Sequence, residues 1–140
     1  ININEIIYDC IKDINSSKYE IEIDEKNKIN TSGRPIQLKR AFQNIIDNSK
    51  RYGTKIKINF KINDDDCTIE INDNGPGIPK DKYEDVFKPF FTLDSSRNKL
   101  KGESGLGLTI TRDIIRSHGG EVKLEKSELG GLKLSVVLPF

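Results

Sequence analysis

The chain has 140 residues, of which 34% are hydrophobic and 32% are charged, and these proportions fit one globular domain over residues 1–140. Its formal net charge is +1, from 23 basic and 22 acidic residues, so the charge balance favours neither nucleic acid nor an anionic membrane as a partner. The only two cysteines, Cys10 and Cys67, lie far apart and outside any metal-ligand spacing. They predict buried, reduced thiols rather than a zinc site or a disulfide framework.

The first third of the chain predicts helix, strand and helix. Apolar residues recur at helical spacing over residues 3–14 and alternate as in a strand over residues 19–23. A short extended piece at residues 29–31 leads to Pro35, which opens a second helix with an apolar stripe. We expect this helix to end near Gly53.

The rest of the chain predicts four strands and one long helix. Alternating apolar residues indicate a hairpin of strands at residues 56–62 and 67–71. Residues 78–107 are mostly polar, glycine-rich or aromatic, with one short helix candidate at residues 81–87, and a loop of this length is usually functional. The last expected elements are a helix at residues 108–118, a strand at residues 121–126, a Gly130-Gly131 turn and a strand at residues 132–138.

Three helices and about five strands, several of them joined as hairpins, favour an α+β fold. We expect a two-layer sandwich in which the helices cover one face of a mixed sheet and the functional site lies on the helix side. The strands do not alternate regularly with helices, and no Gly-x-x-x-x-Gly-Lys-Ser/Thr phosphate loop occurs. These two observations exclude a doubly wound nucleotide-binding fold.

A glycine-rich stretch with Gly102, Gly105 and Gly107 lies directly before the helix expected from residue 108. Glycines let the backbone approach phosphate oxygens, and a helix that begins there offers unpaired N–H groups and the positive end of its dipole. The stretch indicates a phosphate-binding loop, although a plain loop before a helix can have the same composition.

Asn44 and Asn48 lie one helical turn apart and therefore point the same way near the end of the second helix. An amide oxygen there can bind Mg²⁺ while phosphate oxygens and waters complete its octahedron, and Asn48 is the predicted ligand. Arg51 could offset phosphate charge, and Tyr52 offers a flat face for a purine. Taken alone, the helix is better explained by asparagines that merely face solvent.

Asp73 follows a strand expected to be buried and precedes Gly75 and Gly77. A carboxylate fixed there accepts a hydrogen bond from an exocyclic amino group, which adenine carries and guanine lacks at that ring position. This would select ATP over GTP. The alternative is a simple tight turn in which the two glycines supply positive φ angles.

With these residues the chain resembles the ATP-binding catalytic domain of sensor histidine kinases, in the superfamily that includes gyrase, the Hsp90 chaperones and the MutL mismatch-repair proteins. Four sequence boxes of that family occur in order along the chain, an N box, a G1 box, an F box and a G2 box, as LKRAFQNIIDNSKRYG, DNGPGIP, VFKPFF and GESGLGLTI. Four boxes in order are highly specific. The first box and the residues before it are especially similar to the osmosensor type of bacterial kinase.

The resemblance implies that Asn48 coordinates Mg²⁺, that Asn44 supports the phosphate side, that Tyr52 packs on the base and that Asp73 binds the adenine amino group. Arg51, one turn beyond Asn48, is the further residue expected to take part in catalysis. The other residues implied to contact the nucleotide are Gly75, Gly77, Ile78, Phe90, Gly105, Leu106, Gly107 and Leu108. The bound species would be ATP or ADP with Mg²⁺.

Three phenylalanines, Phe87, Phe90 and Phe91, match a region that bounds a mobile ATP lid in the family, although an aromatic cluster that packs a loop onto the core fits them as well. Arg97 falls within the lid region and is expected at the surface; the alternative is a contact with the γ-phosphate. Glu103 stands where the family commonly has a glycine, and the sequence assigns it no role.

The side chain of Asn44 distinguishes ATP hydrolysis from phosphoryl transfer to another protein group. ATP-hydrolysing relatives place a glutamate there to activate water, and an asparagine cannot take a proton, so we expect slow hydrolysis. The expected function is transfer of the γ-phosphoryl group of Mg-ATP to a histidine on the dimerisation domain of the same kinase, for relay to a response regulator. The alternatives are a nucleotide-sensing module that transfers nothing and an ATPase of the gyrase or chaperone kind.

His118 is the only histidine, and it lacks the acidic residue and proline that usually follow a phosphoacceptor histidine. We expect it to be structural, and we expect the phosphoacceptor helices to precede Ile1. The apolar runs are too short to span a membrane, and no signal-peptide pattern follows Ile1. The sequence therefore predicts a cytoplasmic piece of a longer protein that can itself be anchored in the inner membrane.

Overall fold

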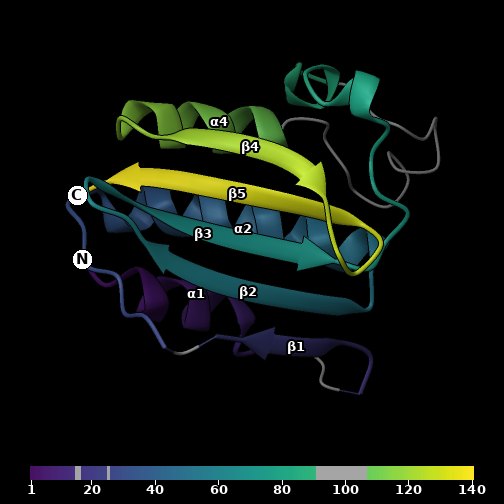
Figure 1. Cartoon of the computed structure of the whole chain (residues 1–140), viewed down its shortest axis with the longest axis horizontal. Helices are drawn as coiled ribbons and strands as arrows, with labels where there is room; N and C mark the ends of the chain where they lie inside the picture. Colours follow the sequence, from purple (N-terminus) through teal and green to yellow (C-terminus); the bar gives the residue numbers. More distant parts are fainter. Residues whose placement is uncertain (15–16, 25, 91–106) are drawn as a thin grey trace.

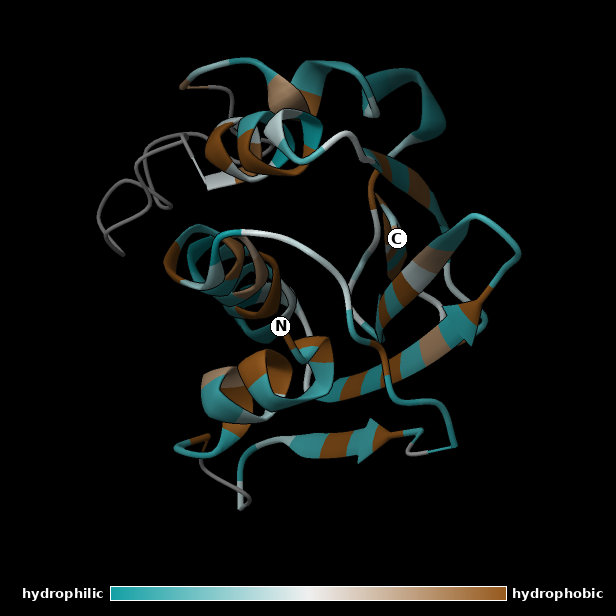
Figure 2. Cartoon of the chain, turned by 90° about the vertical axis from the view of Figure 1, so that its left-hand side faces the viewer, coloured by the Kyte–Doolittle hydropathy of each residue, from teal (hydrophilic) through white to brown (hydrophobic). Residues whose placement is uncertain are grey.

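The structure, a computed structural model, describes residues 1–14, 17–24, 26–90 and 107–140. Five strands form one sheet in the order β1-β2-β3-β5-β4, and the α-helices of these residues cover one of its faces (Figure 1, Figure 2). The helices are α1 (Ile3–Ile11), α2 (Pro35–Tyr52) and α4 (Gly107–Ser117), and the strands are β1 (Glu20–Ile23), β2 (Lys55–Ile62), β3 (Asp66–Asp73), β4 (Glu121–Lys126) and β5 (Leu132–Pro139). The predicted α+β sandwich is confirmed.

The sheet is mixed because β1 pairs in parallel with β2, whereas the other neighbouring strands pair antiparallel. The predicted hairpin is β2–β3, and β3 lies in the middle of the sheet, between β2 and β5. Successive side chains of a strand point to opposite faces, so Ile69 and Ile71 of β3 face the helices together with Asp73. The end of β3 thus delivers a carboxylate to the helix side of the sheet.

Helix α2 occupies the middle of the helix layer, with α1 and α4 packed on either side of it. It begins at Pro35, as predicted, because proline fixes a helical φ and lacks only an N–H that the first turn would leave unpaired. Leu38, Phe42, Ile45 and Ile46 form its buried stripe. Complete burial of one such side chain contributes about 1.5–3 kcal/mol, so the stripe fixes which face of α2 packs against the sheet.

The predicted short helix at residues 81–87 is wrong. The structure has two 3-10 turns instead, η1 (Lys80–Lys82) and η2 (Asp85–Phe87). Only Val86 and Phe87 are buried within this stretch. A segment with two apolar anchors cannot bury a helical stripe, and short 3-10 turns are the usual result.

Helix α1 ends at Ile11, earlier than the predicted limit of residue 14, although Ile14 still packs against the core. Cys10 on α1 and Cys67 on β3 are buried and free, as predicted. Burial raises the pKa of Cys10 to about 11, so this thiol stays protonated at neutral pH. Every helix in the described residues is too short or too polar to cross a bilayer.

On the outer face of the sheet, Glu70 of β3 lies between two lysines. Its carboxylate is 2.9 Å from Lys133 Nζ on β5 and 3.3 Å from Lys61 Nζ on β2, and only 8% of its side chain is exposed. Burial alone would raise the pKa of Glu70, but the hydrogen bonds from the two lysines outweigh it and hold the pKa below its ordinary value. The ionised carboxylate therefore ties three strands together.

Replacing Glu70 with glutamine should lower the free energy of unfolding at neutral pH by about 1–2 kcal/mol, because the two lysines lose their carboxylate. A lowered folded-state pKa gives stability that is present above the unfolded-state value, near 4.5, and is lost as the pH falls through the folded-state value. Urea unfolding from about pH 7 down to about pH 3 measures both effects.

The exposed Glu22 on β1 is the matched control, and Glu22→Gln should leave the unfolding curve unchanged. If Glu70→Gln and the wild-type chain show the same pH dependence, the ion pairs do not stabilise the sheet.

Candidate functional site

The C-terminal half of α2 contacts both segments that the sequence places beside a ligand. Asn44 Nδ2 donates a hydrogen bond to the carbonyl oxygen of Gly107, at a distance of 3.4 Å, where α4 begins. Five residues further along α2, the Ser49 hydroxyl donates to the carboxylate of Asp73 at the end of β3. Helix α2 therefore holds the start of α4 and the end of β3 on the same side of the sheet.

Asp73 is fixed in orientation and almost completely buried, with 3% of its surface exposed. Its Oδ1 atom accepts hydrogen bonds from the backbone N–H groups of Gly75, at 3.0 Å, and Leu132, at 3.1 Å. Burial raises the pKa of Asp73, and the bonds from Leu132, Gly75 and Ser49 offset part of that rise. An oriented, buried carboxylate of this kind can select a ligand by hydrogen bonding.

Two residues that support Asp73 were missed by the sequence analysis. The Gly131 N–H donates to the Asp73 carbonyl oxygen at 3.1 Å, and a Cβ atom on Gly131 would contact the Asp73 carboxylate and lie 2.6 Å from that carbonyl oxygen. The sequence marked this glycine only as part of a turn. Ser49 could have been found, because it lies four residues after Ile45 and therefore on the buried stripe of α2.

The two glycines after Asp73 differ in what they require. Gly77 has a φ of +74°, as the tight-turn alternative expects. Gly75 instead lies against the end of α2, where an added Cβ would come within 2.7 Å of the Tyr52 carbonyl oxygen. Between them and the sheet, Asn74 Oδ1 accepts a hydrogen bond from the Thr54 N–H at 2.8 Å. The loop is thus a turn and also a close contact with α2.

The remaining predicted residues of α2 lie along one side of the helix. Asn48 is half-buried, one turn after Asn44, and its side chain makes no hydrogen bond to another described residue. Arg51 is exposed and Tyr52 is half-buried. Both also line an open groove of about 690 Å³ at the end of α2, together with Tyr19.

Two apolar residues predicted at the site, Ile78 and Leu108, are half-buried and pack against the core. Phe90 is 71% exposed and has a φ of 62°, which is rare for a bulky residue, so it does not join an aromatic cluster on the core. Phe87 is buried, as that alternative expects. Six further residues singled out in the sequence lie outside the described residues, namely Phe91, Arg97, Gly102, Glu103, Gly105 and Leu106.

His118 links the end of α4 to the loop before α2. Its Nε2 atom accepts a hydrogen bond from the Arg34 N–H at 3.0 Å, and its Nδ1 atom lies 2.8 Å from the Ile114 carbonyl oxygen. Because Nε2 accepts the Arg34 N–H, the tautomer that satisfies both contacts carries its proton on Nδ1. Both nitrogens are engaged in holding two helices together, which agrees with the structural role expected for this residue.

Comparisons with known proteins identify the family. Residues 33–140 match the family model described as histidine kinase-, DNA gyrase B- and HSP90-like ATPase. The sensor histidine kinase CpxA of Escherichia coli is 43% identical over 109 residues, which are 77% of this chain and 24% of CpxA. The chain thus spans about a quarter of the length of the curated relatives it matches.

Two solved structures share the fold. The ATP binding domain of PrrB from Mycobacterium tuberculosis superposes with a TM-score of 0.81 at 25% identity, over 99% of this chain and 94% of that one. The histidine kinase domain of the Escherichia coli osmosensor EnvZ superposes with a TM-score of 0.70 at 30% identity, over 99% of this chain and 86% of that one. The chain therefore belongs to the family of histidine kinase-, DNA gyrase B- and HSP90-like ATPases, and within it is the ATP-binding catalytic domain of a sensor histidine kinase.

Proposed function

We propose that this domain binds Mg-ATP between α2 and the start of α4 and transfers the γ-phosphoryl group to a histidine on the dimerisation domain of its own kinase. The observation that carries the proposal is the buried carboxylate of Asp73, which two backbone N–H groups and Ser49 hold at the edge of the helix layer. Burying a carboxylate is unfavourable, and none of the hydrogen bonds of Asp73 comes from a cationic side chain. A carboxylate buried in this way is typical of a group that binds a ligand.

In the proposed complex, Asp73 accepts a hydrogen bond from the adenine amino group and Tyr52 packs on the ring. The first turn of α4 has backbone N–H groups without intrahelical partners, and Gly107 and Leu108 lie in it. These groups would meet phosphate oxygens. The same proposal includes the other residues that the family resemblance implies, Gly75, Gly77, Ile78, Phe90, Gly105 and Leu106.

The residues at the site fit a magnesium ion that is held mainly by the nucleotide. No group of three or more His, Cys, Asp or Glu side chains in the described residues could bind a metal by itself. The half-buried Asn48 offers one amide oxygen, and Mg²⁺ commonly takes its other ligands from phosphates and water. The ion would supply neutralisation of phosphate charge, to which Arg51 adds a positive charge.

Phosphoryl transfer to histidine does not require a general base from this domain. An imidazole nitrogen attacks the γ-phosphorus, the bond to the bridging oxygen breaks, and ADP leaves with the electron pair. The domain contributes position and charge. The alternative reaction, hydrolysis, needs a base for water, and the side chain at that position is Asn44, whose amide nitrogen donates to Gly107. This favours transfer over hydrolysis.

By the same proposal, the domain acts in the cytoplasm, and its partners are the dimerisation domain and the receiver domain of a response regulator. The parent kinase can be anchored in the inner membrane. The curated relatives are sensor kinases much longer than this chain, which supports a parent with further domains.

Replacing Asn48 with alanine should abolish the gain in ATP affinity that Mg²⁺ provides, a loss of about tenfold, because the ion loses its protein ligand. Without Mg²⁺, the affinity should stay within about twofold of the wild-type value. Isothermal titration with ATP, with and without Mg²⁺, measures both quantities. The control is Asn59→Ala, which removes a half-buried asparagine from the outer face of β2. An intact Mg²⁺ effect in Asn48→Ala would refute the metal assignment.

The proposed reaction is tested by supplying the dimerisation domain of the parent kinase and ATP labelled on the γ-phosphate. We expect labelled histidine on the supplied domain. If ATP binds tightly but the histidine stays unlabelled, the domain is a nucleotide-sensing module. If the domain alone hydrolyses ATP at an appreciable rate, it is an ATPase of the gyrase or chaperone kind.

A further inference from the structure

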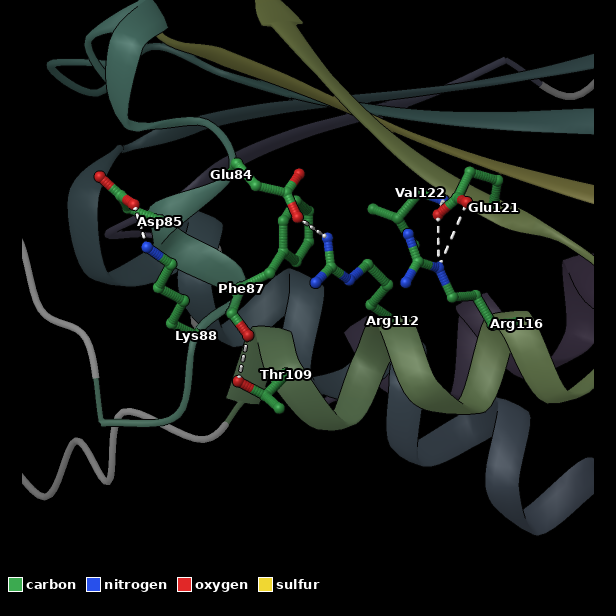
Figure 3. Close-up of polar contacts among 9 residues, drawn as sticks. All are labelled: Glu84, Asp85, Phe87, Lys88, Thr109, Arg112, Arg116, Glu121 and Val122. Carbon is green, nitrogen blue, oxygen red and sulfur yellow. Dashed lines mark hydrogen bonds and ion pairs between the residues drawn. The ribbon is translucent and has the colours of Figure 1, made fainter.

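The side chain of Arg112 on α4 packs against the 3-10 turn η2 (Figure 3). One of its guanidinium nitrogens is 2.8 Å from Glu84 Oε1, and the guanidinium carbon lies 4.3 Å from the centroid of the Phe87 ring. Only 17% of the Arg112 side chain is exposed. Arginine is well suited to this place because its planar cation can stack on an aromatic ring while it donates to a carboxylate.

A second contact joins the same two segments closer to the start of α4. The Thr109 hydroxyl donates a hydrogen bond of 2.6 Å to the carbonyl oxygen of Phe87. Thr109 and Arg112 are one turn apart on α4, so both lie on the face turned toward η2. Phe87 itself is buried and belongs to the hydrophobic core. The ring and the carbonyl of one anchored residue therefore fix two successive positions of α4.

The other side of the same turn is held by α2. The Thr111 hydroxyl donates to the Gly107 carbonyl oxygen at 2.8 Å and lies 3.4 Å from the Ala41 carbonyl oxygen. Asn44 adds its bond to Gly107. The first turn of α4 is thus clamped between α2 and η2. Its backbone N–H groups point along the helix axis, so the clamp sets where they lie.

We propose that Arg112 is a positioning residue for phosphate binding: through Phe87 it fixes the first turn of α4, whose N–H groups receive the triphosphate. The inference rests on the proposed function, since it presupposes that phosphates bind at this turn. Arg112 does not touch the nucleotide. It acts by removing the reorganisation that a loose turn would undergo before binding.

A second arginine on α4, Arg116, provides a matched control for substitutions of Arg112. Arg116, one turn beyond Arg112, forms an ion pair with Glu121, with N–O distances of 3.1 and 3.2 Å (Figure 3). Both of these side chains are substantially exposed, at 51% and 43%, and the pair joins α4 to β4 rather than to η2. Loss of this pair removes an ion pair from the same helix but leaves the first turn clamped.

The experiment compares ATP and adenosine binding to the wild-type chain and to Arg112→Met, Arg112→Lys and Arg116→Met. Arg112→Met keeps the aliphatic packing and should weaken ATP about tenfold while changing adenosine by less than about twofold, because adenosine has no phosphates. Arg112→Lys should recover part of the loss, since lysine keeps the charge but not the planar group. Arg116→Met should leave both affinities within about twofold.

Equal weakening of ATP and adenosine by Arg112→Met, or an equal effect of Arg116→Met on ATP, would overturn the inference. No binding of ATP by the wild-type chain would instead refute the proposed function. Thermal melting identifies a variant that fails to fold. In that case Glu84→Gln, which changes only an exposed partner, should still weaken ATP selectively by about threefold, and no selectivity there would also overturn the inference.

Discussion

Replacing Asp73 with asparagine should reduce the affinity for ATP by about 100-fold or more and leave the fold intact. Asparagine has the same shape, and its amide oxygen can still accept the N–H groups of Gly75 and Leu132 that now bind Oδ1. Its NH₂ group would then face the amino group of adenine, so two donors would meet where a donor and an acceptor met before. Isothermal titration measures the loss.

The same substitution should raise the melting temperature at neutral pH. Because burial raises the pKa of Asp73, the stability that this group provides is complete below its unfolded-state pKa, near 3.8, and is lost as the pH rises through the folded-state value. At neutral pH the ionised carboxylate therefore costs stability, and the neutral amide removes that cost. In the wild-type chain, ATP affinity should fall as the pH is lowered through the raised pKa.

Asp66 is the matched control, since it begins the strand that Asp73 ends. Asp66→Asn should change ATP affinity by less than about twofold. If Asp73→Asn binds ATP within about tenfold of the wild-type chain, Asp73 does not recognise the base.

The second large effect concerns Gly131, where alanine should destabilise the domain by about 3 kcal/mol or more. Its Cβ would contact the Asp73 carboxylate and come within 2.6 Å of the Gly75 nitrogen, and all of these atoms are held in the sheet or in the loop after it. The strands β3 and β5 would have to separate locally. Urea unfolding followed by circular dichroism measures the loss, and ATP binding should weaken with it.

Gly130 separates a steric effect from a backbone effect. It has a φ of +100°, yet nothing lies within 4 Å of an added Cβ. Gly130→Ala should therefore cost only the strain of a positive φ, about 1–2 kcal/mol. If Gly131→Ala is no more destabilising than Gly130→Ala, the close packing of Gly131 against Asp73 is not a constraint.

The periodicity of apolar residues predicted the helices and strands correctly where one face of the element is buried along its whole length. The alternation around Ile58 and Ile69 gave the β2–β3 hairpin, and the stripe through Leu38 and Ile45 gave α2. The prediction of one helix at residues 81–87 was wrong, because two buried side chains are too few to define the spacing of a helix or of a strand. The local sequence pattern thus predicts secondary structure only where several apolar residues lie on one buried face.

The candidate site could be predicted only in part, because local motifs name residues but not their partners. Asp73 was identified from its place after a strand and before two glycines. Its support by Leu132 and Gly131 depends on the pairing of β3 with β5, which sequence spacing does not reveal. Likewise, the sequence shows Arg112 only as a charged residue of an amphipathic helix, and its contact with Phe87 of η2 is visible only in the structure. Contacts between distant segments were the missing information.

The hydrogen bond from Leu132 to Asp73 joins residues that are 59 positions apart in the chain. During synthesis, α2 and the β2–β3 hairpin leave the ribosome well before Leu132 does. The proposed pocket for the base therefore cannot be completed by the nascent chain until its last strand has emerged and paired with β3. On this proposal, nucleotide would not assist the early steps of folding and would stabilise only a domain whose sheet is already complete.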